Sequence, residues 1–251
     1  MPKFFIRSNQ INNNIITIEG EDVKHISNVL RMKVGDVIQV CNTDTTENFN
    51  AEIKSFEKDS IDLSVIEKIE SEAESSIELS IYQGVPKSDK MELIIQKSTE
   101  LGVKAFVPVD MERCVSKING KDAVKKIDRW QKISEVAAKQ SGRDMIPTVG
   151  NVISIKELCN TIEDMDMLIV PYERAEGYSF KDAIEELKIL EKDNLKIGIV
   201  IGPEGGFEPS EIEELKNNGG KVVTLGKRIL RTETVALAMS SVIMYELGGS
   251  I

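Results

Sequence analysis

Hydrophobic residues occur in short runs separated by turns through the first seventy residues of the chain. The runs at residues 15–18, 37–40, 51–56 and 61–66 have the length and the β-branched content of strands. A short helix is expected through residues 23–30, where apolar side chains recur every three to four positions. The pattern predicts a small β-barrel-like module and not a repeated strand–helix unit.

From residue 77 onward, strand-like runs alternate with helical patterns. Apolar residues between Met91 and Leu101 recur at helical spacing, after Ser88-Asp89 as a cap and before Gly102 as a stop. Further strands are expected at residues 77–85, 103–109, 167–170, 197–201 and 222–225, and further helices around 127–141, 155–162, 180–190 and 209–217. This alternation predicts an α/β fold with a parallel sheet that is covered on both faces.

The stretch from Glu67 to Ser76 is acidic, polar and rich in serine, which is typical of a connection between domains. We therefore expect two domains, residues 1–72 and residues 73–251.

The last helix, expected at residues 233–247, is apolar on nearly all sides. A helix of this kind has to be buried on most of its surface. Either its own domain encloses it or a second subunit covers it, and we favour a homodimer.

Composition limits the class of protein. The chain has 251 residues, of which 41% are hydrophobic, and no apolar run approaches the roughly 18–20 residues that a membrane helix needs. Its first residues are also too briefly apolar for a signal peptide, so we expect a cytoplasmic protein without a membrane partner. His25 is the single histidine, and the three cysteines are widely spaced, so we expect no metal site and reduced, buried thiols.

The charge is unevenly distributed. The net charge is −10, yet residues 113–143 carry nine basic groups against three acidic ones, a local net charge of +6. We call these nine the basic island: Arg113, Lys117, Lys121, Lys125, Lys126, Arg129, Lys132, Lys139 and Arg143. A basic island on an acidic protein can bind phosphate locally. The alternative, a solvated helix face, stays open from charge alone.

Three loops follow predicted strands, at residues 170–173, 202–207 and 226–234. Ligands of open parallel sheets bind beyond the carboxyl ends of the strands. The second loop, Gly-Pro-Glu-Gly-Gly-Phe, is neither a P-loop nor a dinucleotide fingerprint, and its Glu204 would repel a phosphate. It therefore favours an uncharged nucleoside or a cationic sulfonium, although such a loop can also be a tight turn only.

The third loop joins two arginines to the aliphatic residues Ile229 and Leu230, which could cover an adenine ring. Another interpretation is structural: Arg231 and Glu233 could form an ion pair at the start of the final helix, with a threonine as its N-cap.

Several strings in this order resemble one known family. They are IGPEGGF and LGKRILRTET, with KSDKMELIIQKSTELGV, Glu112-Arg113-Cys114, AAKQSGRDMIP and HISNVLRMKVGD upstream. Together they are similar to the uridine-N3 methyltransferases of 16S ribosomal RNA, in the SPOUT superfamily. Departures are few: Glu208 stands where serine or threonine is more usual, Val235 replaces a common alanine, and there is one histidine where many relatives have two.

The resemblance implies a PUA-like RNA-binding β-barrel at residues 1–72 and a SPOUT domain with a deep trefoil knot at residues 73–251. It implies S-adenosylmethionine as cofactor and 16S ribosomal RNA, or the small ribosomal subunit, as substrate. The residues expected to bind the cofactor are Val170, Pro171, Tyr172, Ile201, Gly202, Glu204, Gly205, Gly206, Leu225, Gly226, Ile229, Leu230 and Thr232.

For catalysis we expect Arg231 to orient the uracil or stabilise its developing anion, with Glu233 assisting proton removal or holding the arginine. The residues expected to dock RNA are Arg7, His25, Arg31, Arg113, Lys117, Arg129, Lys139 and Arg143. The main competing interpretation is a non-catalytic RNA-binding or ribosome-assembly factor. A relative that methylates another RNA position is a further possibility, and an oxidoreductase is disfavoured because the dinucleotide fingerprint is missing.

Overall fold

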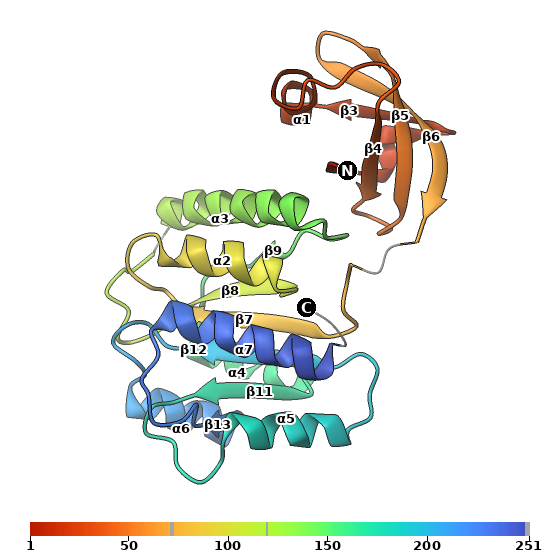
Figure 1. Cartoon of the computed structure of the whole chain (residues 1–251). Coiled ribbons are helices and arrows are strands. Elements are labelled where there is room, and N and C mark those ends of the chain that lie inside the picture. Colours follow the sequence, from red (N-terminus) through yellow and green to blue (C-terminus); the bar gives the residue numbers. More distant parts are fainter. Residues whose placement is uncertain (71–72, 119, 249–251) are drawn as a thin grey trace. The chain divides into compact units, whose positions relative to one another are not determined.

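The computed structural model describes residues 1–70, 73–118 and 120–248, which form two compact units (Figure 1). The first unit comprises Met1–Glu74 and Ala138–Ile146, and the second comprises Ser75–Ala137 and Pro147–Ile251. The domain boundary expected after residue 72 involves a position outside the described residues and stays a prediction.

The first unit is built on a curled, mixed sheet of six strands in the order β1-β4-β5-β6-β3-β2 (Figure 1). The strands are β1 (Lys3–Ile6), β2 (Ile11–Asn12), β3 (Ile15–Glu19), β4 (Val37–Asn42), β5 (Asn48–Phe56) and β6 (Ser60–Ile69). Only β1 and β4 pair in parallel among the strand pairs described. The four strands expected from the sequence are confirmed, while the brief β1 and β2 were not predicted.

The sheet curls around an apolar core that alternate strand residues supply. Ile16 and Ile18 of β3 are buried, as are Ile61 and Leu63 of β6. Between them in sequence, α1 (Glu21–Lys24) continues into a π-helical turn at His25–Val29, and this segment buries Val23 and Ile26. The expected short helix is therefore present. The sequence predicted a β-barrel, and the structure has a curled half-barrel of mixed parallel and antiparallel strands.

Residues 138–146 join the first unit through buried charged groups. Arg143 is 3% exposed, and its guanidinium donates to both carboxylate oxygens of Glu74, with Nη2 2.6 Å from Oε2. Asp144 pairs with Lys3, whose ammonium group also donates to the carbonyl of Gly142 at 3.2 Å. These ion pairs bind residues 143–144 to Lys3 of β1 and to Glu74. They were not predicted from the sequence.

The second unit has a parallel sheet in the order β10-β8-β7-β12-β11-β13, with β9 paired to β8 (Figure 1). Its strands are β7 (Glu78–Gly84), β8 (Ala105–Asp110), β9 (Thr148–Val149), β10 (Ile153–Ser154), β11 (Met167–Pro171), β12 (Lys196–Ile201) and β13 (Lys221–Val223). Its helices are α2 (Lys90–Glu100), α3 (Gly120–Ser141), α4 (Ile155–Cys159), α5 (Phe180–Ile189), α6 (Pro209–Asn217) and α7 (Thr232–Leu247). The predicted parallel α/β arrangement is confirmed.

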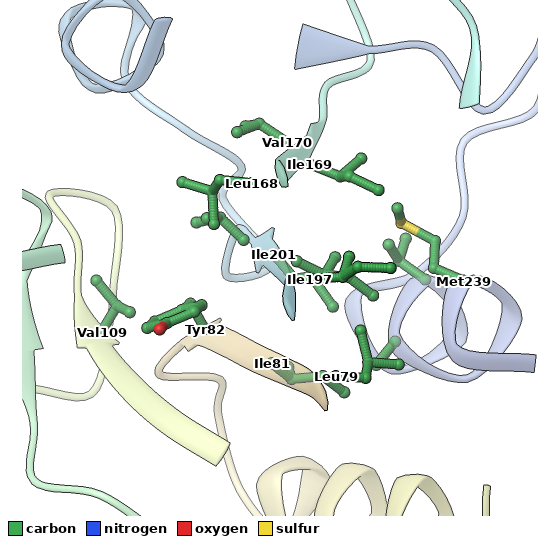
Figure 2. Close-up of a cluster of buried hydrophobic side chains, with 14 of the residues drawn as sticks. Leu79, Ile81, Tyr82, Val109, Leu168, Ile169, Val170, Ile197, Ile201 and Met239 are labelled. Atoms are coloured by element: carbon green, nitrogen blue, oxygen red, sulfur yellow. The ribbon is translucent and has the colours of Figure 1, made fainter. Parts of the chain in front are cut away.

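The central strands are buried on both faces, as their unbroken apolar sequences indicate. Figure 2 shows side chains of β7, β11 and β12 gathered with Met239 of α7. Gly198 permits the closest packing in this layer, because a Cβ there would lie 2.6 Å from Cδ1 of Leu168. A larger residue at this position would force the side chains of Leu168, Met165 and Tyr82 to shift.

Helix α7 contacts both α2 and α5. Its buried residues include Val235, Ala236, Met239, Ile243 and Met244, which confirms that most of the apolar helix is covered within its own unit. It nevertheless leaves two large side chains outside: Val242 and Tyr245 are exposed.

The thiols of Cys41, Cys114 and Cys159 are free and buried, as expected. Burial raises the pKa of Cys41 to about 11, although the nearby Lys3 opposes the shift. In the part of the chain that the structure describes, no helix is long and apolar enough to span a bilayer.

We expect Glu74→Gln to lower the free energy of unfolding of the first unit by about 3 kcal/mol, because it removes a charged acceptor of two hydrogen bonds from a buried guanidinium. Denaturant unfolding followed by circular dichroism measures this change. Glu52→Gln, which breaks the exposed pair with Lys54, is the matched control and should cost less than about 1 kcal/mol. Equal losses in the two variants would contradict a structural role for the buried pair.

Candidate functional site

The three loops predicted to carry chemistry meet in one pocket of the second unit. The pocket has a volume of about 530 Å³ and lies at the carboxyl ends of β11, β12 and β13. Residues 171–173, 201–207 and 224–232 supply most of its wall. Of the residues expected to bind a cofactor, all line this pocket except Val170, which is fully buried in the core (Figure 2). A parallel sheet thus places loops that are distant in sequence around one cavity.

The glycine-rich loop keeps its shape because side chains are missing where neighbours approach. Gly206 has a φ of +70° and closes a turn by donating its N–H to the carbonyl of Pro203 at 2.9 Å. A Cβ on Gly205 would lie 2.9 Å from Cβ of Arg113, whose Nη1 donates to the Gly205 carbonyl at 3.0 Å. Arg113 therefore supports the loop from outside the pocket.

A buried glutamine ties the loops to one another. Gln83, at the end of β7, is fully buried and donates from Nε2 to the hydroxyl of Thr232 at 2.9 Å. That hydroxyl donates in turn to the carbonyl of Gly202 at 2.8 Å. The same amide also donates to the carbonyl of Gly84 at 2.9 Å. This chain of bonds fixes the start of α7 against the glycine-rich loop.

Gln83 was missed in the sequence, although a signal was present. It is a polar residue directly after Ile81-Tyr82 in a strand that is buried at this end, and such a buried amide needs internal hydrogen-bond partners. Thr232 was predicted, but the reason for its position becomes clear only from this contact.

Lys90, at the first position of α2, was also missed, and it lines the pocket. Its ammonium nitrogen lies 2.8 Å from Oε1 of Glu204 and 3.6 Å from Oε2 of Glu233. The hydrogen bond that Lys90 donates to Glu204, with the charges of both glutamates, raises the pKa of Lys90 although partial burial opposes the shift. Lys90 thereby connects the glycine-rich loop to the start of α7.

Glu204 is an ion-paired carboxylate in this pocket. Burial alone would raise its pKa, but hydrogen bonds from Lys90 and from backbone amides, including that of Lys87, hold the pKa below its ordinary value. Its negative charge is therefore matched by a cation at the wall, and its repulsion of a phosphate is weaker than the sequence alone suggests.

The third loop exposes three cations at the pocket rim: Lys227, Arg228 and Arg231. None of them has a carboxylate within ion-pair distance among the described residues. Glu233 faces Lys90 instead of Arg231, so the alternative of an Arg231–Glu233 ion pair at the helix start is not found. The N-cap of α7 is Arg231, and no side chain caps it.

Five of the nine cations in the basic island pair with carboxylates from elsewhere in the chain. Arg113 pairs with Glu208 at 2.7 Å, and Lys117 pairs with Asp110 at 2.8 Å. The other three pairs are Arg129 with Glu92, Lys139 with Asp22, and Arg143 with Glu74. The side chain of Lys121 lies outside the described residues. The local charge of +6 counted along the sequence is therefore not the charge that a ligand meets.

Of these five, Arg143 is the one that is buried, so its placement favours a structural role over the expected contact with RNA. The three residues expected to dock RNA from the first unit are all exposed. Arg7 and Arg31 form no ion pair among the described residues, and Arg31 adopts a left-handed backbone with a φ of 54°. The ring of His25 packs edge-on against Phe4, with 6.0 Å between the ring centroids.

Comparison with known proteins identifies relatives that cover almost the whole chain. A family described as "RNA methyltransferase domain" matches residues 73–244, and one described as "RNA methyltransferase PUA domain" matches residues 18–66. The chain is 41% identical to "Ribosomal RNA small subunit methyltransferase E" of Bacillus subtilis over 92% of its length and 90% of the relative's. It is 32% identical to "Ribosomal RNA small subunit methyltransferase E 2" of Borreliella burgdorferi, with 90% and 88% of the two chains covered.

Among solved structures, the chain is similar to the ribosomal RNA small subunit methyltransferase E of Neisseria gonorrhoeae bound to S-adenosyl methionine. The TM-score is 0.86, with 30% identity and 99% of each chain covered. The site geometry and these matches lead to one conclusion: the chain belongs to the RNA methyltransferase family whose members include the ribosomal RNA small subunit methyltransferases E.

Proposed function

We propose that the protein transfers a methyl group from S-adenosylmethionine to N3 of a specific uridine in the 16S ribosomal RNA of the small subunit. The observation that carries the proposal is the meeting of the three loops in one pocket at the carboxyl end of the parallel sheet. The bound cofactor of the Neisseria gonorrhoeae relative and the names of the curated relatives support it.

The pocket suits S-adenosylmethionine in size and in chemistry. Its volume of about 530 Å³ falls in the usual range for small-molecule sites. Ile229 and Leu230 offer apolar cover for an adenine ring, and the glycine-rich loop offers backbone groups at close range. Glu173, exposed at the rim, offers a carboxylate to a cationic ligand. When bound, the cofactor supplies an electrophilic methyl group on a sulfonium.

In the proposed mechanism, residues of the protein orient the uracil and assist removal of the proton from its N3. Arg231 is exposed at the rim and has no carboxylate partner in the described structure, so its guanidinium is available to the carbonyl oxygens of a uracil. It would orient the base and stabilise the anion that develops as the N3 proton leaves. Glu233 would assist proton removal, and Lys90 holds it in place at 3.6 Å. Positioning of two reactants supplies much of the acceleration.

For RNA docking we retain the three exposed residues of the first unit, Arg7, His25 and Arg31. In the basic island, Arg113, Lys117, Arg129 and Lys139 could contact RNA only while sharing their charge with a carboxylate, and Arg143 is buried. We therefore assign the larger share of RNA docking to the first unit. A closed PUA-like barrel in this unit stays a prediction.

We further propose that the protein is a cytoplasmic homodimer and that the second unit carries the deep trefoil knot expected of a SPOUT domain. Support for the dimer comes from α2 and α7, which pack on each other and leave Leu93, Val242 and Tyr245 exposed. The cytoplasmic location follows from the proposed substrate, the small ribosomal subunit.

Incubation of undermethylated small ribosomal subunits with the protein and S-adenosylmethionine should add one methyl group to a single uridine. Mass-spectrometric mapping of the 16S RNA locates the group, and calorimetry measures cofactor binding. Naked 16S RNA in parallel shows whether the assembled particle is needed. A protein that binds RNA without binding the cofactor would instead be a non-catalytic factor.

Arg231→Ala should reduce kcat by at least about 100-fold, because it removes charge stabilisation that develops in the transition state. The affinity for S-adenosylmethionine should stay within about threefold, since backbone and apolar groups supply most of that site. Single-turnover methylation and calorimetry measure the two quantities. Lys227→Ala, at the same rim, is the control with little expected effect on kcat. A fully active Arg231→Ala enzyme would remove the catalytic assignment.

Light scattering at micromolar concentration should give about twice the chain mass of 27.9 kDa. Tyr245→Asp should shift the protein toward monomer, because it places a charge in the proposed apolar interface. Val124→Asp changes a comparably exposed valine on α3 and should leave the mass unchanged. A monomeric wild-type protein would refute the dimer.

A further inference from the structure

A second cleft adjoins the candidate cofactor pocket in the same unit. Its volume is about 520 Å³, and its walls come from residues 172–178, α6 and the edge strand β13. Tyr172 lines both cavities, so this side chain is the partition between them. The ring of Tyr172 is itself held edge-on against Phe207, with 6.4 Å between centroids.

The loop that forms the partition is fixed by backbone hydrogen bonds to β13 and the residue after it. Tyr172 donates its N–H to the carbonyl of Val223 at 3.0 Å. Thr224 then donates to the carbonyl of Tyr178, and Phe180 donates to that of Thr224, each at 3.0 Å. The cleft is therefore a built feature of the sheet edge, not the gap beneath a loosely attached loop.

Cations predominate in the lining of the cleft. Arg174, Lys216 and Lys221 lie there with one carboxylate, Glu176. Lys221 is paired with Glu186 at 2.8 Å, and the hydroxyl of Tyr178 also donates to Glu186. Burial and this carboxylate raise the pKa of Tyr178, which keeps the phenol protonated as a donor to Glu186.

Arg174 and Lys216 differ from the five paired cations of the basic island, because neither has a carboxylate partner among the described residues. Both are exposed, and no ion pair of either is found among the described residues. In contrast, Arg113, Lys117 and Arg129 of the same unit are each paired within 2.9 Å. In a chain of net charge −10, two unpaired cations at a cleft beside the active pocket are available for an anionic ligand.

We propose that this cleft binds a backbone phosphate of the substrate RNA, from a nucleotide next to the one whose base enters the cofactor pocket. The inference rests on the proposed function, because it takes the RNA strand to pass over Tyr172. Arginine binds phosphate with a planar pair of donors, and lysine adds a second positive charge. The exposed cations Lys227 and Arg228 at the rim of the first pocket extend the same positive path.

The test compares the double variant Arg174→Ala/Lys216→Ala with the control Lys125→Ala/Lys126→Ala, which removes two exposed charges from α3. Filter binding of 16S RNA over a range of salt concentrations is the first measurement. For the cleft variant, the slope of log K against log salt should decrease in magnitude by about 0.7 for each lost contact with single-stranded RNA. The control should change the slope by less than half as much.

Methylation kinetics on small ribosomal subunits is the second measurement. The cleft variant should show a KM for subunits raised roughly tenfold, as expected from lost phosphate contacts, with kcat retained. Its affinity for S-adenosylmethionine, measured by calorimetry, should equal that of the wild type, which also shows that the variant is folded. The variant Arg174→Lys/Lys216→Arg, which keeps both positive charges, should retain most of the RNA affinity that the double alanine variant loses.

An unchanged salt slope in the cleft variant, or an equal change in the control, would overturn the proposal. These outcomes differ from failure of the proposed function, in which the wild-type protein neither binds S-adenosylmethionine nor methylates the subunit. Filter binding still decides the role of the cleft in that case, because it does not depend on catalysis.

Discussion

The candidate site depends above all on the hydrogen bonds that run from Gln83 through the hydroxyl of Thr232 to the carbonyl of Gly202. They join the end of a central strand, the start of the last helix and the glycine-rich loop inside an apolar core. The amide nitrogen of Gln83 and the hydroxyl of Thr232 are both hydrogen-bonded, and a buried donor without a partner costs free energy, so these bonds hold the three segments together. The pocket keeps its shape because hydrogen bonds connect the segments at its base.

The sequence was sufficient for the α/β class, for most of the strands and for the loops that form the pocket. Apolar runs such as that of β12 are buried on both faces, and this burial leaves a direct trace in the sequence. The rule that ligands bind beyond parallel strands then located the loops. Val170 does not line the pocket, because it belongs to β11 and its side chain is buried in the core.

The charge that the surface presents to a ligand could not be predicted in the same way, because ion pairs form between residues distant along the chain. A window from 113 to 143 contains nine cations, but Glu208, Glu92 and Glu74 lie outside it and neutralise three of them. Short β1 and β2 were missed for a related reason: pairing partners, not their own few residues, define them. Local composition is therefore a poor guide to the electrostatic surface of this acidic protein.

When these ion pairs are taken into account, the wall and the rim of the pocket differ in charge. At the wall, the two carboxylates of Glu204 and Glu233 face the single ammonium group of Lys90, so one negative charge is left over. At the rim, Lys227, Arg228 and Arg231 stay unmatched in the described structure and face solvent. A wall with a net negative charge suits a cofactor that carries a cationic sulfonium, and a rim of exposed cations suits a polyanion. Two ligands of opposite character can thus meet in one cavity without either being repelled at its own end.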